Sequence, residues 1–175
     1  SELKIAVMST SLPTPAQCVR VHVAAAASGR KRALCKDSSW AGERAPLEAE
    51  KNQDADEILL ADESGEGLLE GLVTNFFVID HEGVLITAKE HVLEGHMRAL
   101  VIHTWQAQGG RVSYTTPTLS EASSWKAAFL TSAVRLPQPI SEICWPHVAG
   151  APSHKFSDFA PVLEFQSLVQ QALDE

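Results

Sequence analysis

Residues 69–87 read Leu-Glu-Gly-Leu-Val-Thr-Asn-Phe-Phe-Val-Ile-Asp-His-Glu-Gly-Val-Leu-Ile-Thr, and they contain the clearest β pattern of the chain. Residues 73–79 are rich in β-branched and aromatic side chains, which favour a strand. Residues 80–83 have the composition of a tight turn, and residues 84–87 are again β-prone. This stretch therefore predicts a β-hairpin near the middle of the chain.

Further strands are expected where apolar or alternating runs are bounded by turn residues. These runs lie at residues 19–23, 57–61, 68–70, 111–115, 128–132 and 137–144, and another strand-like piece precedes the proline-rich turn at residues 12–15. Residues 26–32 and 62–67 are expected to form a loop and a turn. The sequence thus predicts strands along its whole length, separated by short connections.

Four helices are expected between these strands. Residues 40–53 have helical spacing, and a start near Ala45 would put Pro46 in the first turn, where proline is tolerated. The apolar spacing after Gly95 predicts a helix that Gly109 ends. Residues 118–126 begin with a capping box, and residues 162–173 have an apolar stripe. Because strands and helices mix without regular β-α-β alternation, we expect an α+β domain with a mixed, curled sheet.

Composition limits the function classes. The 175 residues suit one globular domain, and the net charge of −8 without a basic stripe argues against nucleic acid as a partner. The sequence has no apolar run of about 18 residues and no signal pattern, so we expect neither membrane insertion nor secretion. Three dispersed cysteines, Cys18, Cys35 and Cys144, predict reduced thiols, which favours the cytoplasm and leaves an organelle open.

Four segments combine residues that could carry chemistry. Lys36 lies in residues 35–40, between a loop and the start of a helix, and Glu70 precedes the hairpin. Residues 92–98 form a glycine turn that opens a helix, and residues 129–135 contain a Thr-Ser pair that is followed by Pro-Ile. The histidines do not indicate a metal site, since their spacing does not put two of them one helical turn apart on one face.

In this order the four segments resemble the motifs of the class IV aminotransferases, which are fold-type IV pyridoxal-phosphate (PLP) enzymes. Branched-chain and D-amino-acid aminotransferases and aminodeoxychorismate lyase belong to that family. The resemblance covers about residues 30–145. It implies the fold of the C-terminal large domain, a mixed curled sheet (pseudo-barrel) with flanking helices. We therefore expect residues 1–175 to form this single domain, with the family's small N-terminal domain absent.

The resemblance implies roles for four residues around one site. Lys36 would be the catalytic residue, forming a Schiff base with PLP and moving protons at the substrate. A lysine suits both tasks because its amine can lose a proton and attack a carbonyl. Glu70 would face the pyridine nitrogen and keep it protonated, which makes the ring a better electron sink. Thr74 and Asn75 would order the site around these two residues.

The resemblance also implies a phosphate site. The backbone N–H groups of His96 and Met97, after Gly95, would bind the phosphate, and Arg98 would support it with charge. Phosphate binding here also has a physical basis that is independent of the family, because a glycine turn at a helix N-terminus presents free N–H groups to an anion.

A second phosphate-side segment is implied by the Thr-Ser pair. Thr131 and Ser132 would belong to the cofactor-binding set. Ala133 departs from the family pattern, which often has a threonine that reaches the phosphate at this position. Met97 also replaces a frequent threonine, although its backbone donor is unaffected.

The function expected from the resemblance is that of a PLP-dependent aminotransferase acting on an amino acid and a 2-oxo acid. Two alternatives stay open: a PLP-dependent lyase of the aminodeoxychorismate type, and a truncated, non-catalytic scaffold or dimerisation domain. The resemblance further implies a homodimer whose active site lies near the subunit interface.

Overall fold

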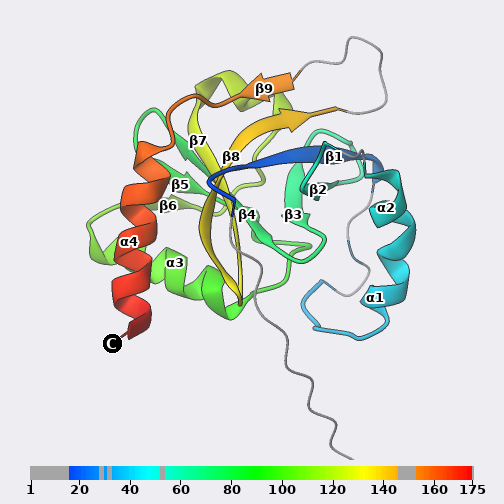
Figure 1. Cartoon of the computed structure of the whole chain (residues 1–175), viewed down its shortest axis with the longest axis horizontal. Helices are drawn as coiled ribbons and strands as arrows, with labels where there is room; N and C mark the ends of the chain where they lie inside the picture. The colour runs from blue at the N-terminus through cyan, green and yellow to red at the C-terminus, as the bar shows by residue number, and fades with distance from the viewer. Residues whose placement is uncertain (1–15, 28–29, 31–32, 52–53, 146–152, 175) are drawn as a thin grey trace, which may run out of the picture.

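A closed ring of strands forms the centre of the molecule. The computed structural model describes residues 16–27, 30, 33–51, 54–145 and 153–174, and nine strands pair into one sheet in this part of the chain. Six of them close into a barrel in the order β3-β2-β1-β8-β7-β4, with β4 pairing back to β3 (Figure 1). The barrel strands are β1 (Val19–Ala27), β2 (Glu57–Ala61), β3 (Leu68–Gly71), β4 (Asn75–Asp80), β7 (Trp125–Ser132) and β8 (Arg135–Cys144).

The sheet is mixed in direction. Strand β1 runs parallel to both of its neighbours, β2 and β8, whereas the other barrel pairs are antiparallel. Strand β5 (Val84–Ile86) extends the sheet from β4 and pairs in parallel with β6 (Arg111–Ser113), and β9 (Ser153–Lys155) pairs with β8. The prediction of an α+β domain with a mixed, curled sheet is therefore confirmed.

Helices flank the barrel on two sides. Helices α3 (His96–Ala107) and α4 (Ala160–Asp174) lie together on one side, and the short helices α1 (Trp40–Glu43) and α2 (Ala45–Glu50) lie on the opposite side (Figure 1). A 3-10 helix, η1 (Leu119–Ser124), leads into β7. In the described part of the chain, no helix is long and apolar enough to cross a membrane.

Strand β4 shows why this sequence forms a layered core. Its apolar run is buried on both faces, as is typical of a strand covered on both sides. Phe76 and Val78 belong to the apolar cluster inside the barrel, while Phe77 and Ile79 belong to the cluster beneath α3 and α4. The Phe77 ring stacks on Phe129 of β7, with 5.0 Å between the ring centres. Because successive side chains of β4 point to opposite faces, this one strand contributes to two apolar clusters.

A third apolar cluster attaches the α1–α2 side to the barrel. Ile58 and Leu60 of β2 are buried together with Leu72, and Trp40 and Leu47 pack against this group from the two short helices. These contacts determine where the segment before α1, which contains Lys36, lies on the barrel.

Several local predictions needed correction. The helix expected over residues 40–53 is two short helices that meet at Arg44, and Pro46 lies in the first turn of α2. The predicted strand at residues 73–79 begins only at Asn75, because residues 71–74 form the turn of a hairpin. The capping box of η1 is confirmed, but that helix ends at Ser124.

Other differences lie at element ends. Ala26 and Ala27, expected in a loop, belong to β1, and the strand predicted at residues 111–115 ends at Ser113. Strand β9 had no expectation in the sequence. The strand-like piece and turn expected before residue 16 lie outside the described residues.

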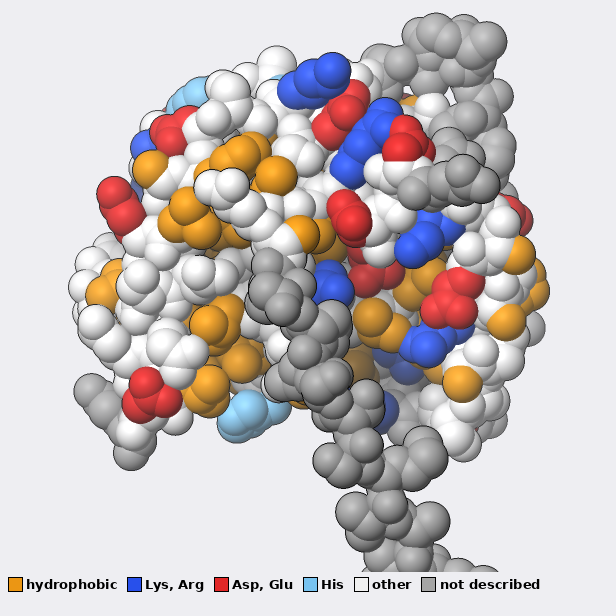
Figure 2. Space-filling view, viewed as in Figure 1, with side chains coloured by type: hydrophobic (Ala, Val, Ile, Leu, Met, Phe, Trp, Pro, Cys, Tyr) orange, Lys and Arg blue, Asp and Glu red, His pale blue; other side chains and the backbone are white. Residues whose placement is uncertain are grey.

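Charged side chains are unevenly distributed. Figure 2 shows acidic and basic side chains gathered over the half of this face where β1, α1 and α2 lie. Arg20 of β1 forms ion pairs with Asp54 and with Glu142, whose Oε2 lies 2.9 Å from Arg20 Nε. Among the residues that the structure describes, no cluster of acidic, histidine and cysteine side chains is suited to hold a metal ion.

Candidate functional site

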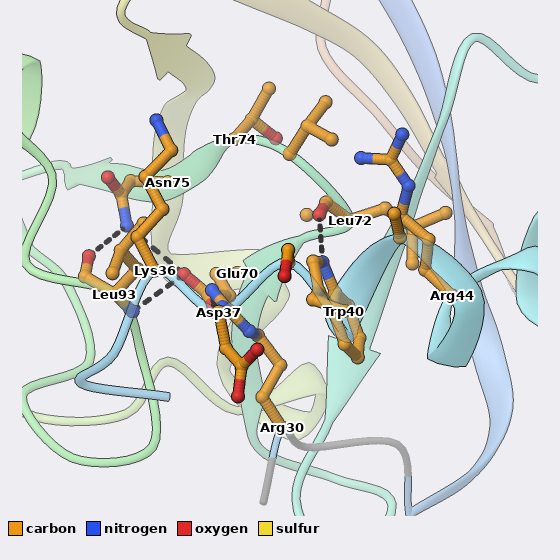
Figure 3. A pocket seen from close by; sticks show the side chains of 14 residues that line it. Arg30, Lys36, Asp37, Trp40, Arg44, Glu70, Leu72, Thr74, Asn75 and Leu93 are labelled. Carbon is orange, nitrogen blue, oxygen red and sulfur yellow. Dashed lines mark hydrogen bonds and ion pairs between the residues drawn. The ribbon is translucent and has the colours of Figure 1, made fainter. Parts of the chain in front are cut away.

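A cavity of about 460 Å³ lies between α1 and the β3–β4 hairpin. Its wall includes the loop before α1, the turn at residues 71–74 and Leu93 (Figure 3). Four of the residues singled out in the sequence line it together, namely Lys36, Glu70, Thr74 and Asn75. The fold therefore brings together two segments that are more than 30 residues apart in the chain.

Glu70 is the buried acid of this cavity. Its side chain is only 3% exposed, and its Oε2 accepts hydrogen bonds from the backbone N–H of Leu93 at 2.8 Å and from Asn75 Nδ2 at 3.3 Å. Burial raises the pKa of Glu70 to about 7, although the Leu93 N–H and the nearby Arg30 favour the charged form. Glu70 can therefore exchange a proton near neutral pH.

Asn75 connects Glu70 to the loop before α3. Its Nδ2 also donates to the carbonyl of Leu93 at 2.7 Å, so one amide group ties β4 to both neighbours. Gly95 makes this close approach feasible, because a Cβ added there would lie 2.6 Å from Asn75 Oδ1. The predicted site residues Asn75 and Gly95 thus contact one another.

The turn at residues 71–74 has a buried anchor of its own. The N–H of Gly71 donates to the carbonyl of Thr74 at 2.8 Å, and Thr74 Oγ1 donates to Glu57 Oε2 at 3.4 Å. Burial raises the pKa of Glu57. Thr74 therefore lines the cavity while its hydroxyl is held by the buried Glu57.

Arg30 is a cavity residue that the sequence did not reveal. Its Nη1 lies 3.5 Å from Glu70 Oε1, its Nη2 donates to the carbonyl of Cys35 at 3.0 Å, and its guanidinium lies 4.9 Å from the ring centre of Trp40. Trp40 is itself fixed by a 2.7 Å hydrogen bond from Nε1 to the carbonyl of Leu72. Three consecutive basic residues at 30–32 offered no local signal for choosing one of them.

Lys36 lies at the exposed edge of the cavity. Its side chain is exposed, and Figure 3 shows its amine pointing away from Glu70. The lysine and the buried acid therefore share a cavity without forming an ion pair in this structure. Such an arrangement leaves room between them for a ligand.

The other predicted site residues do not line this cavity. Met97 is buried in the core at the start of α3, whereas His96 is exposed. Arg98 is buried, and its Nη2 donates to the carbonyl of Ala88 at 2.8 Å, which braces the loop before α3. Burial lowers the pKa of Arg98. Gly95 and Arg98 border a second hollow of about 330 Å³ beside α3.

Thr131 and Ser132 lie at the end of β7. Thr131 pairs directly with Asn75 across the sheet, but its Oγ1 donates to the carbonyl of Arg135 at 2.7 Å. Ser132 Oγ accepts from the N–H of Val134 at 3.4 Å. Both side chains therefore stabilise the β7–β8 turn, one strand away from the cavity.

The fold is similar to those of solved aminotransferases. A branched-chain aminotransferase from the archaeon Thermoproteus uzoniensis with norvaline has a TM-score of 0.75 at 19% identity, with 93% of this chain and 55% of that chain covered. The T.th. branched-chain aminotransferase with pyridoxamine 5'-phosphate also has a TM-score of 0.75, at 22% identity, with 94% and 54% covered.

A hypothetical aminotransferase from Mycobacterium tuberculosis, in an alpha-ketoglutarate and PMP bound form, has a TM-score of 0.72 at 18% identity, with 94% and 61% covered. The chain thus spans between half and two thirds of the length of these structures. Identities this low show a shared fold. A search of the curated proteins gave no match.

The family is shown by the sequence model of amino-transferase class IV, which matches residues 2–143. This range is most of the 175 residues and includes Lys36, Glu70 and Gly95. The chain therefore belongs to the class IV aminotransferase family.

Proposed function

We propose that this chain forms the cofactor-binding part of a PLP-dependent aminotransferase, which moves an amino group between an amino acid and a 2-oxo acid, with Lys36 as the Schiff-base lysine. The observation that carries the proposal is the presence of Lys36 and the buried Glu70 on one cavity wall. Family membership supports it, as do similar structures that hold PLP or pyridoxamine phosphate.

The residues present fit this cofactor. A cavity of about 460 Å³ is within the range of small-molecule sites. It offers an amine at its edge and, deep inside, a carboxyl group whose pKa of about 7 lets it either hold or release a proton. When bound, PLP supplies an electron sink for the carbanion that forms at the substrate α-carbon.

Glu70 is proposed to face the ring nitrogen and keep it protonated. Three groups hold its carboxylate in position: the Leu93 N–H, Asn75 Nδ2 and Arg30. A cation brought next to Glu70 favours its ionised form, because opposite charges in a dry site attract strongly. The acid would therefore be charged when the cofactor is bound, although burial raises its pKa to about 7.

Lys36 is proposed to attach the cofactor covalently and, once released, to move a proton at the substrate α-carbon. Its position at the cavity edge fits both tasks, since a flexible four-carbon stem lets the amine swing between two positions. Thr74 and Asn75, which line the cavity with Lys36, are proposed to keep its wall in shape. Gly95, His96, Met97, Arg98, Thr131 and Ser132 stay predictions for the phosphate end.

The decisive experiment is reductive labelling. The purified chain is incubated with PLP, reduced with borohydride and digested, and the modified lysine is mapped by mass spectrometry. We expect selective labelling of Lys36, its loss in Lys36→Ala, and no change in Lys126→Ala, which removes an exposed lysine of β7. Scattered labelling of surface lysines that Lys36→Ala does not alter would sink the proposal and favour the scaffold alternative.

Product analysis separates the two catalytic alternatives. If Lys36 is labelled, the chain is assayed with amino acids and 2-oxo acids for amino-group exchange. Exchange supports the aminotransferase, and a product of bond cleavage without exchange supports the lyase.

We also propose that the chain acts as a homodimer, as the family resemblance implies. Two apolar side chains near the cavity are exposed and would be covered by a second copy of the chain. They are Leu34, which is 72% exposed, and Val73, which is 53% exposed. Sedimentation equilibrium of the wild type and of Leu34→Ser/Val73→Ser tests this proposal, with a dimer expected only for the wild type.

A further inference from the structure

We propose that Arg44 binds the side-chain carboxylate of an acidic substrate, so that the site selects dicarboxylic amino acids or 2-oxo acids. This inference rests on the proposed function and deepens it. Among its described lining residues the cavity has three cations, Arg30, Lys36 and Arg44, and two acids, Asp37 and Glu70, in a chain whose net charge is −8.

Two of the three cations already have a task. Arg30 is committed to Glu70, the carbonyl of Cys35 and the face of Trp40. Lys36 is the proposed attachment point of the cofactor. Arg44 is therefore the one cation of the described cavity lining that has no role in the proposed function.

The backbone holds Arg44 firmly at the cavity edge. It lies between α1 and α2, and both of its main-chain polar groups are bonded: its N–H donates to the Trp40 carbonyl at 2.9 Å, and its carbonyl accepts from Glu48 N–H at 2.9 Å. Its side chain is only 29% exposed. The point from which the side chain extends is therefore fixed before a ligand binds.

The ion pair that the Arg44 guanidinium forms with Glu48 involves its Nε atom. Its Nε lies 3.1 Å from Glu48 Oε1 as an i,i+4 ion pair, yet this buried Nε makes no proper hydrogen bond among the described residues. The pair occupies the Nε side of the planar group. The two Nη atoms stay on the other side, which is the geometry that binds a carboxylate through two parallel hydrogen bonds.

The position of Arg44 fits the far end of a substrate. Figure 3 shows Lys36 and Arg44 on opposite sides of the cavity, with Leu72 and Thr74 between them. A substrate whose reacting carbon lies near Lys36 would therefore extend its side chain toward Arg44. An apolar side chain would cover the Nη atoms of Arg44 without pairing them, which costs binding free energy, whereas a carboxylate bonds to them.

Titration of two oxo acids tests this inference. The full chain, with and without PLP, is titrated with 2-oxoglutarate and with 4-methyl-2-oxopentanoate by calorimetry. Arg44→Gln should raise the Kd of the dicarboxylate about tenfold, as expected for loss of a charged hydrogen bond, and leave that of the monocarboxylate within about twofold. Arg44→Lys should restore part of the affinity, because it keeps the charge but not the planar fork.

The matched control is Arg111→Gln. Arg111 is 68% exposed and pairs with Glu82 away from the cavity, so the same charge is removed without an effect on either oxo acid. Equal weakening of both oxo acids by Arg44→Gln would mean that Arg44 binds their shared carboxylate, and no weakening would mean that it binds neither; each result overturns the inference.

Reductive labelling of Lys36 in each variant keeps the two proposals apart. If Lys36 is labelled throughout and the dicarboxylate affinity does not respond to Arg44, only this inference fails. If Lys36 is never labelled, the proposed function fails, and the titrations without PLP still decide the role of Arg44.

Discussion

Asn75 Nδ2 lies 3.3 Å from Glu70 Oε2, and the two residues also pair directly across the hairpin between β3 and β4. The same amide group reaches the carbonyl of Leu93 at 2.7 Å. One short side chain thus positions the buried acid and the loop before α3 together.

Stability should depend on pH through Glu70. Its pKa is raised from 4.5 to about 7 in the folded chain, so between these pH values the folded state holds a proton that the unfolded state has released. The stabilisation is complete below pH 4.5 and lost as pH rises through about 7, a difference of about 3 kcal/mol. Urea unfolding of the wild type and Glu70→Gln at about pH 5 to 8 should show a flatter profile for the variant. Parallel profiles would contradict this prediction.

Arg30→Met should raise the pKa of Glu70 further. Arg30 Nη1 lies 3.5 Å from Glu70 Oε1 and favours its ionised form, so its removal leaves burial less opposed. A carbon-13 NMR titration of the labelled glutamate side chains would follow the shift. Arg111→Gln is the control, and a Glu70 pKa that is equal in both variants would refute the coupling.

Gly95→Ala should destabilise the fold and weaken PLP binding. The added Cβ would lie 2.6 Å from Asn75 Oδ1, so the contact between Asn75 and Glu70 must shift, at a cost of about 1–3 kcal/mol. Gly42→Ala is the matched control, since nothing lies within 4 Å of its added Cβ and α1 favours alanine. Unfolding free energies that are the same for both variants would argue against this explanation.

Trp40 should report on the cavity by fluorescence. Its ring lies on the guanidinium of Arg30, and its Nε1 donates to the carbonyl of Leu72. Addition of PLP should therefore quench Trp40, and Trp40→Phe should lose most of the change in emission. Trp105→Phe, which alters a ring of α3 that packs on Phe165 of α4, should retain the change in emission. If Trp105→Phe loses the change instead, the ligand binds elsewhere.

The sequence was most informative where local patterns decide structure. The hairpin around residues 73–87, the helix after Gly95 and the capping box at Thr118 depend on neighbouring residues, and all three are present. Strand β9 could not be predicted, because three residues become a strand only through pairing with β8. The closure of the barrel is likewise a property of distant pairings, such as that of β1 with β8.

The candidate site likewise contains residues that the sequence indicated and residues that it did not. Lys36, Glu70 and Asn75 lie in motifs of recognisable spacing, and the structure brings them together. Arg30 was missed because its importance depends on a contact with Glu70, 40 residues away. Arg44 lies just before the expected helix start near Ala45, and no pattern in the sequence indicated that this position, between two short helices, would line the cavity.

The hairpin at residues 71–74 also has a consequence for the order of folding. Glu70 and Asn75 are five residues apart and can meet as soon as this turn forms, whereas the contact of Arg30 with Glu70 closes a loop of 40 residues. Contacts of short sequence separation form early, and long loops close later. The acid and its amide partner should therefore protect their backbone amides from solvent exchange before the lysine segment docks. The cofactor cavity would then be completed in two steps, with the acid side in place before the lysine side.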